Sequence, residues 1–84
     1  MKAVINRRTA FIDLVGFYYS TIKRGMTPTQ HRVYVDILFA GGLLMPWQIR
    51  DARAAITVAD VAIREGVPKA RVLADLRKNL QTKD

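Results

Sequence analysis

Apolar residues recur at intervals of three and four along most of the chain, which is the spacing of one face of a helix. The first run predicts a helix from about Thr9 to Lys23, and Gly25 suits its end. Its apolar face consists of Phe11, Leu14, Val15, Tyr18 and Ile22. The residues before this run show no clear period, so we predict that residues 1–8 form a flexible arm.

The second predicted helix has a clear start signal. Thr27 can cap a helix, Pro28 fits the first helical position, and Gln30 stands three residues after the cap. The residues that follow, as far as Ala40, are apolar on nearly every side, which is typical of a helix at the centre of a domain. Two glycines come next, and their low helix propensity predicts that the helix ends there.

The second half of the chain predicts further helices over about residues 47–55, 58–65 and 68–80. A proline opens the first and the last of them. Thr57 and Asp60 form a capping box for the middle one, since a carboxylate stands three residues after a threonine. The whole pattern therefore predicts an all-α fold, a small bundle of four to five helices in a single domain that spans the chain.

The stretch TVADVAIREGVPKARVLADL resembles the helix-turn-helix of bacterial repressors, in particular the DNA-binding headpiece of the lac-repressor-type family. With the end of the last helix, this unit covers residues 57–80, at the opposite end of the chain from its place in that family. The resemblance implies that Val58 and Val61 anchor the first helix to the core. It also implies that the two helices cross at Ala62 and that Gly66 forms the tight turn.

In such motifs the second helix enters the major groove of double-stranded DNA. The DNA-binding residues that the resemblance implies are Thr57, Pro68, Lys69, Ala70, Arg71, Ala74, Arg77 and Lys78. The groove-facing positions among them are Pro68, Lys69, Ala70 and Ala74, of which Lys69 is the one strong polar reader. Depending on the docking angle, phosphates or bases would be reached by Arg71, Arg77 and Lys78. Thr57 would contact the DNA backbone from a helix N-cap.

The charge of the chain agrees with such a partner. Its 84 residues include 14 basic and 7 acidic ones, a formal net charge of +7, which favours a polyanion such as nucleic acid. We therefore predict a small DNA-binding transcriptional regulator of the kind found in phages and other mobile elements. A homodimer is expected, because one short motif buries too little DNA surface for strong specificity.

A second interpretation remains open, because half of the residues are apolar. The chain could be a small helical inhibitor or adaptor that binds another protein, such as a phage-encoded inhibitor of a host protein. Its active part would then be an exposed apolar and aromatic surface around Tyr19, Tyr34, Met45 and Trp47.

Candidate residues for catalysis are few, so we do not predict an enzyme. The chain has no cysteine, and its single histidine, His31, is expected to have a surface or capping role. No acidic cluster stands near His31 and nothing brings Ser20 beside it, so neither a metal site nor a catalytic triad is expected. We predict no cofactor.

The most apolar stretch, residues 33–49, is short for a membrane span and contains Asp36, two glycines and Pro46. We therefore predict no membrane partner. No signal peptide is recognised, and the absence of cysteine fits a reducing compartment, so the expected location is the cytoplasm.

Overall fold

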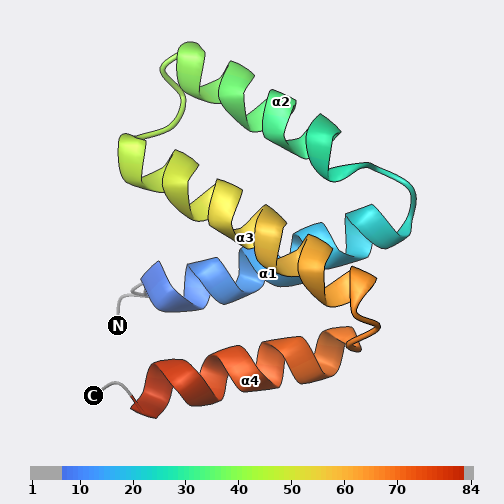
Figure 1. Cartoon of the computed structure of the whole chain (residues 1–84). Coiled ribbons are helices and arrows are strands. Elements are labelled where there is room, and N and C mark those ends of the chain that lie inside the picture. Colours follow the sequence, from blue (N-terminus) through green and yellow to red (C-terminus); the bar gives the residue numbers. More distant parts are fainter. Residues whose placement is uncertain (1–6, 83–84) are drawn as a thin grey trace, which may run out of the picture.

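The computed structural model describes residues 7–82, which form four α-helices and contain no strand. The helices are α1 (Arg7–Lys23), α2 (Pro28–Ala40), α3 (Pro46–Arg64) and α4 (Lys69–Thr82). In Figure 1, α1 and α3 cross at the centre, and α2 and α4 lie on opposite sides of this pair. The prediction of an all-α fold is confirmed, and the number of helices is the lower of the four to five expected.

The predicted N-terminal arm lies only partly within the described residues. Arg7 and Arg8 belong to the first turn of α1, so the prediction of an arm is wrong for these two. Residues 1–6 lie outside the described part of the chain.

The core lies where α3 crosses α1. Val15 of α1 and Ile56 of α3 are completely buried. The remaining buried apolar positions of α3 are all alanine, at 52, 55, 59 and 62. Because the distance between packed helices depends on the side chains at the contact, this alanine face lets α3 lie close to α1.

Residues 46–64 form one continuous helix, so the prediction of two helices here is wrong. Thr57 lies in the middle of α3, where its hydroxyl donates a hydrogen bond to the carbonyl of Arg53 (3.1 Å). No glycine or proline interrupts the segment, and alanine, the best helix former, is frequent in it. The helix therefore continues through Thr57 and Asp60. A capping box cannot form there, because its first residue must be non-helical.

The capping box of α2 forms as predicted. The hydroxyl of Thr27 accepts from the backbone N–H of Gln30 (3.1 Å), and the Gln30 side chain accepts from the backbone N–H of Thr27 (2.8 Å). The sequence of α2 indicates a helix at the centre of the domain, but in the structure α2 is peripheral, so this prediction is wrong. The helix packs against α3 and buries only His31 and Val35. A strip of its apolar residues remains more than half exposed: Val33, Tyr34 and Ile37.

Gly66 ends α3 with a backbone φ of +73°, in the left-handed region that glycine adopts without strain. The N–H of Val67 bonds the carbonyl of Ala62 (2.9 Å), and that of Gly66 bonds Ile63 (3.1 Å), the pattern of a Schellman turn. The phenol of Tyr19 donates to the carbonyl of Val67 (2.7 Å) and so ties this turn to α1.

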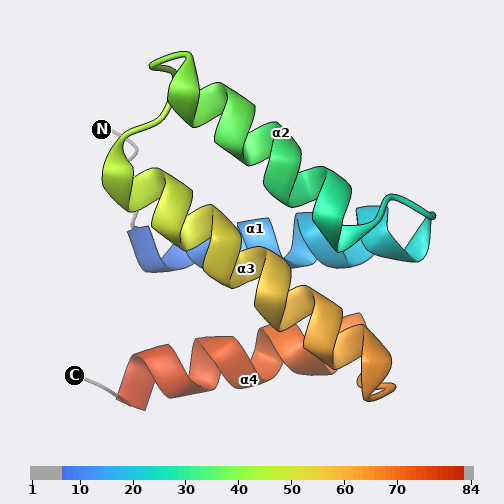
Figure 2. The same ribbon diagram turned by 45° about the horizontal axis from the view of Figure 1, so that its top comes forward.

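After the turn, α4 runs back antiparallel to α1 and packs against it (Figures 1 and 2). Leu73 lies over Gly16, where an added Cβ would stand 3.4 Å from its methyl carbon. Ala62 is buried, but the main packing partner of α4 is α1 and not α3. Val58 packs against the core, whereas Val61 is 43% exposed, so the predicted anchoring role of Val61 is wrong. The arrangement of a helix-turn-helix therefore stays a prediction.

Candidate functional site

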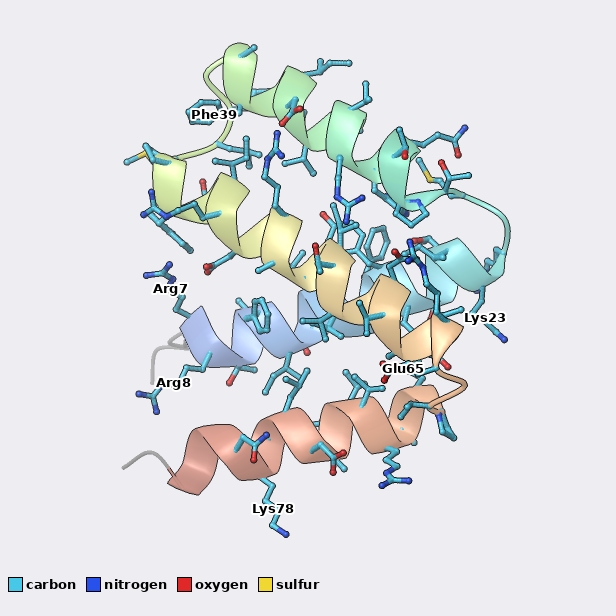
Figure 3. All side chains as sticks on the ribbon, viewed as in Figure 1. Arg7, Arg8, Lys23, Phe39, Glu65 and Lys78 are labelled. Carbon is cyan, nitrogen blue, oxygen red and sulfur yellow. The ribbon has the colours of Figure 1, made fainter. Side chains whose placement is uncertain are left out.

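One candidate surface lies on α4, on the side turned away from α1. Its residues are Ala70, Arg71, Ala74, Arg77 and Lys78, and all five are exposed. They recur at intervals of three and four, so they share one side of the helix, which we call the outer face of α4. Figure 3 shows the labelled Lys78 extending away from the rest of the molecule.

The cations of the outer face have few partners within the protein. Arg71 forms an i,i+4 ion pair with Asp75 at 3.9 Å, and both side chains are more than 60% exposed. An exposed pair of this length contributes little, so it does not hold Arg71 in place. Arg77 and Lys78 form no ion pair within residues 7–82.

The other residues implied by the repressor resemblance lie elsewhere. Lys69 turns towards α1, where its Nζ donates to the hydroxyl of Ser20 (2.8 Å). Pro68 is exposed at the start of α4. Thr57 lies on the α2 side of α3 and accepts a hydrogen bond from Arg32 (3.2 Å). The structure thus brings five of the eight predicted residues together and separates Thr57 from them.

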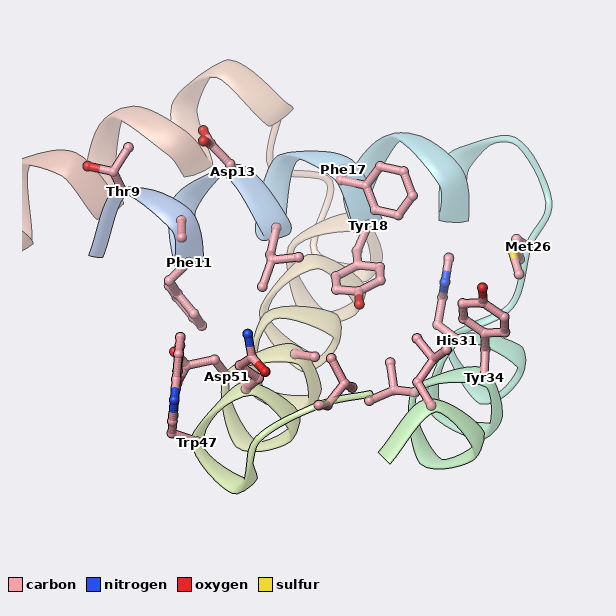
Figure 4. Close-up of a pocket in the computed structure, with 17 residues that line it drawn as sticks. Thr9, Phe11, Asp13, Phe17, Tyr18, Met26, His31, Tyr34, Trp47 and Asp51 are labelled. Atoms are coloured by element: carbon pink, nitrogen blue, oxygen red, sulfur yellow. The ribbon is translucent and has the colours of Figure 1, made fainter. Parts of the chain in front are cut away.

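A second candidate surface is an apolar groove of about 900 Å³ between α1, α2 and the start of α3. Five of the seven aromatic residues of the chain line it: Phe11, Phe17, Tyr18, Tyr34 and Trp47. In Figure 4, Phe11 and Trp47 mark one end of the groove, and Met26 and Tyr34 mark the other. Half of the remaining twelve lining residues are aliphatic.

Tyr18 and His31 of the groove lining are joined to Thr21, outside the lining, in a small polar network. The hydroxyl of Thr21 donates to the carbonyl of Tyr18 (3.2 Å) and lies 2.7 Å from Nε2 of His31. The direction of this second bond follows the tautomer of the His31 ring. Burial lowers the pKa of His31 from its ordinary value of 6.5, which favours the neutral ring. The prediction of a surface or capping role for His31 is therefore wrong, since the side chain is buried.

Tyr18 is only 6% exposed, and burial raises the pKa of its phenol. Within the part of the chain that the structure describes, nothing hydrogen-bonds its hydroxyl, and no fully buried side-chain polar atom lacks a partner. The oxygen is therefore reachable from the groove, and Figure 4 shows it directed into the space between α1 and α2.

The rim beside Trp47 is neutralised by an ion pair. Arg7 donates to both carboxylate oxygens of Asp51 (2.9 and 3.0 Å) and lies 4.8 Å from the centre of the Trp47 ring. The hydrogen bonds from Arg7 lower the pKa of Asp51. Asp13, the other acidic residue of the lining, is exposed and points away from the groove in Figure 4. The interior of the groove is therefore uncharged.

Two of the four residues of the protein-binding interpretation, Tyr34 and Trp47, line the groove. Met45 is exposed outside it, and the hydroxyl of Tyr19 is engaged with the α3–α4 turn. Sequence reasoning missed the contribution of Phe11 and Tyr18. Phe11 and Tyr18 are seven residues apart and therefore lie on the same side of α1. This spacing is the same whether that side packs in the core or lines a groove.

No cluster of three metal-binding side chains occurs within residues 7–82. Of the helices described, none has the combination of length and apolar character that crossing a membrane requires. Comparison with protein-family models, curated proteins and solved structures gives no match to this chain.

Proposed function

We propose that the protein binds double-stranded DNA through the outer face of α4. The observation that carries this proposal is the two-sided character of that helix. Leu73 and Val72 fix one side to the rest of the protein, while Arg71, Arg77 and Lys78 stand exposed on the other. The net charge of +7 would add long-range attraction to a polyanion.

The shape of α4 also suits this partner. A helix with its side chains is about 10–12 Å across, close to the width of the major groove, about 12 Å. Ala70 and Ala74 keep the outer face thin between the cations, which would let the helix axis approach the bases. In this proposal the segment from α3 to α4 acts as the helix-turn-helix of a small transcriptional regulator.

The roles of the α4 residues in this proposal differ from those implied by the resemblance. Lys69 is bound to Ser20 and would contribute little to base reading. Arg71, Arg77 and Lys78 would supply phosphate contacts, each releasing a condensed counterion. Binding would thus depend steeply on salt and weakly on sequence, since alanines occupy two of the positions that would read bases.

A titration of duplex DNA at several salt concentrations tests this proposal. Removing two phosphate contacts with the double variant Arg71→Ala, Lys78→Ala should lower the slope of log K against log salt by about two. The matched control, Lys23→Ala with Arg53→Ala, removes the same charge away from α4 and should leave most of that slope. Equal loss in both variants, or no duplex binding at low salt, would contradict the proposal.

A second candidate function is binding of another protein, and the exposed strip of α2 favours it. Val33, Tyr34 and Ile37 are each more than half exposed and lie within two turns of the same helix. Apolar residues grouped at the surface mark interaction sites when they form a large patch. Since α2 and α4 lie on opposite sides of α1 and α3, a partner on α2 would leave α4 uncovered. A protein that co-purifies in stoichiometric amount from nuclease-treated lysate, and is lost with Ile37→Ser, would support this function.

A further inference from the structure

The apolar groove between α1 and α2 has the properties of a small-molecule site. Its volume of about 900 Å³ falls in the range of about 300–1,000 Å³ that holds such ligands. Such sites are mostly apolar with a few convergent polar groups, and here one polar group is the hydroxyl of Tyr18. We propose that this groove binds an uncharged, flat aromatic molecule that accepts a hydrogen bond from Tyr18.

The charge of the ligand follows from the lining. Arg7 pairs with Asp51, Asp13 points away from the groove, and burial favours the neutral ring of His31, so no unpaired charge faces the interior. A charged ligand would lose its hydration without gaining a counter-ion, which disfavours its binding. An uncharged molecule avoids this cost.

The aromatic character of the ligand follows from the walls. Phe11 and Trp47 at one end and Phe17 and Tyr34 at the other present ring faces and edges to the space between them. The rings of Tyr18 and His31 already stand edge to face, with centroids 4.8 Å apart. Aromatic groups prefer such offset and edge-on contacts with one another, so a flat ring system would find matching surfaces along the groove.

The polar requirement follows from Tyr18. The Tyr18 residue as a whole is only 6% exposed, but its hydroxyl opens into the groove and has no partner within residues 7–82. A purely apolar ligand would cover this donor and leave it unsatisfied, whereas a ligand with an acceptor would bind it. The ligand therefore carries an acceptor, such as a ring carbonyl, near the middle of its length.

Nile red, a neutral aromatic dye with a ring carbonyl, is a suitable probe. Its fluorescence rises in apolar surroundings, and Trp47, the only tryptophan, reports from the groove wall. We expect saturable binding of one dye per chain with a change in Trp47 emission. Tyr18→Phe should weaken binding about fivefold, the effect of one hydrogen bond.

A pair of matched variants separates the groove from other apolar surface. Ala10→Phe adds a ring to a lining position and should abolish binding, whereas Ala54→Phe adds the same ring at an exposed position outside the groove and should not. Circular dichroism and thermal unfolding verify that both variants fold.

Two results would overturn the inference. The first is the absence of saturable dye binding. If Ala10→Phe then also releases a co-purifying protein, the groove is a protein-docking surface. The second is equal dye binding by wild type and Ala10→Phe, which would locate the dye elsewhere. Neither result bears on DNA binding through α4, since the groove and the outer face share no residue.

Discussion

The hydroxyl of Tyr19 joins segments that are 48 residues apart, because it donates to the carbonyl of Val67 in the turn between α3 and α4. Tyr19→Phe removes the donor and leaves a half-buried carbonyl without its partner. We expect a loss of about 1 kcal/mol in unfolding free energy, or about 4–8 °C in Tm. Tyr34→Phe, which removes an exposed hydroxyl, is the control and should change Tm by less than about 2 °C. Equal shifts would show that the bond does not stabilise the turn.

His31 provides a second test at this scale. Burial lowers the pKa of His31 in the folded protein below its ordinary 6.5, so the unfolded chain takes up the proton first as pH falls. Stability should therefore be constant above pH 7, fall as pH drops below about 6.5, and level off below the folded pKa. The slope within that window is at most about 1.4 kcal/mol per pH unit.

Urea titrations between pH 7.5 and 5 measure this slope, and His31→Gln should flatten it, because the glutamine amide can hydrogen-bond Thr21 but does not titrate. Asp51 does not interfere. Its pKa is lowered below 3.8, so its contribution is lost only at more acidic pH. A slope that persists in His31→Gln would assign the dependence to another group.

At the scale of single helices, the same local signal has two outcomes. Thr27 and Thr57 are each followed three residues later by a side chain that can complete a capping box. The box forms at Thr27, where Gly25 breaks the helix before it, and Thr57 lies inside α3, where nothing does. A capping pattern therefore predicts a helix start only where the preceding residues leave the helix.

This difference predicts opposite effects for the same substitution. Thr27→Ala removes a true cap and should cost about 1 kcal/mol, within a range of about 0.5–2 kcal/mol. Thr57→Ala places a better helix former at a solvent-exposed position in the middle of α3. The resulting gain in unfolding free energy, up to about 0.7 kcal/mol, offsets the loss of the exposed hydrogen bond from Arg32. Chemical denaturation of both variants checks the signs, and a clear loss in Thr57→Ala would argue for a helix boundary at this position.

Helix type and most boundaries were predictable because caps, glycines and apolar spacing are local. Which face each helix buries was harder to predict, because it depends on partners distant in sequence. The sequence of α2 is apolar on nearly all sides, yet only His31 and Val35 are buried, since α1 and α3 already cover each other. Lys69 likewise lies on the predicted reading side by sequence alone but meets Ser20 once α4 packs on α1.

For the whole molecule, this packing implies an uneven distribution of stability. The central pair, α1 and α3, contains every completely buried residue within the described chain, whereas α4 buries Val72 alone among residues 69–79. Elements with few buried apolar contacts open locally at a lower free energy than the whole protein. α2 also forms one wall of the groove, so its opening would give a ligand access.

Native-state hydrogen exchange should therefore rank the helices. The central amides of α3 should exchange only through global unfolding, with a free energy that falls steeply as urea is added. The amides of α2 should exchange at a lower free energy with little dependence on urea, because local opening exposes little surface. Val35→Ala should lower protection in α2 more than in the centre of α3, since Val35 is one of only two buried side chains on α2. If α2 and α3 instead showed the same free energy and the same urea slope, the four helices would unfold as one cooperative unit and the groove wall would be as rigid as the core.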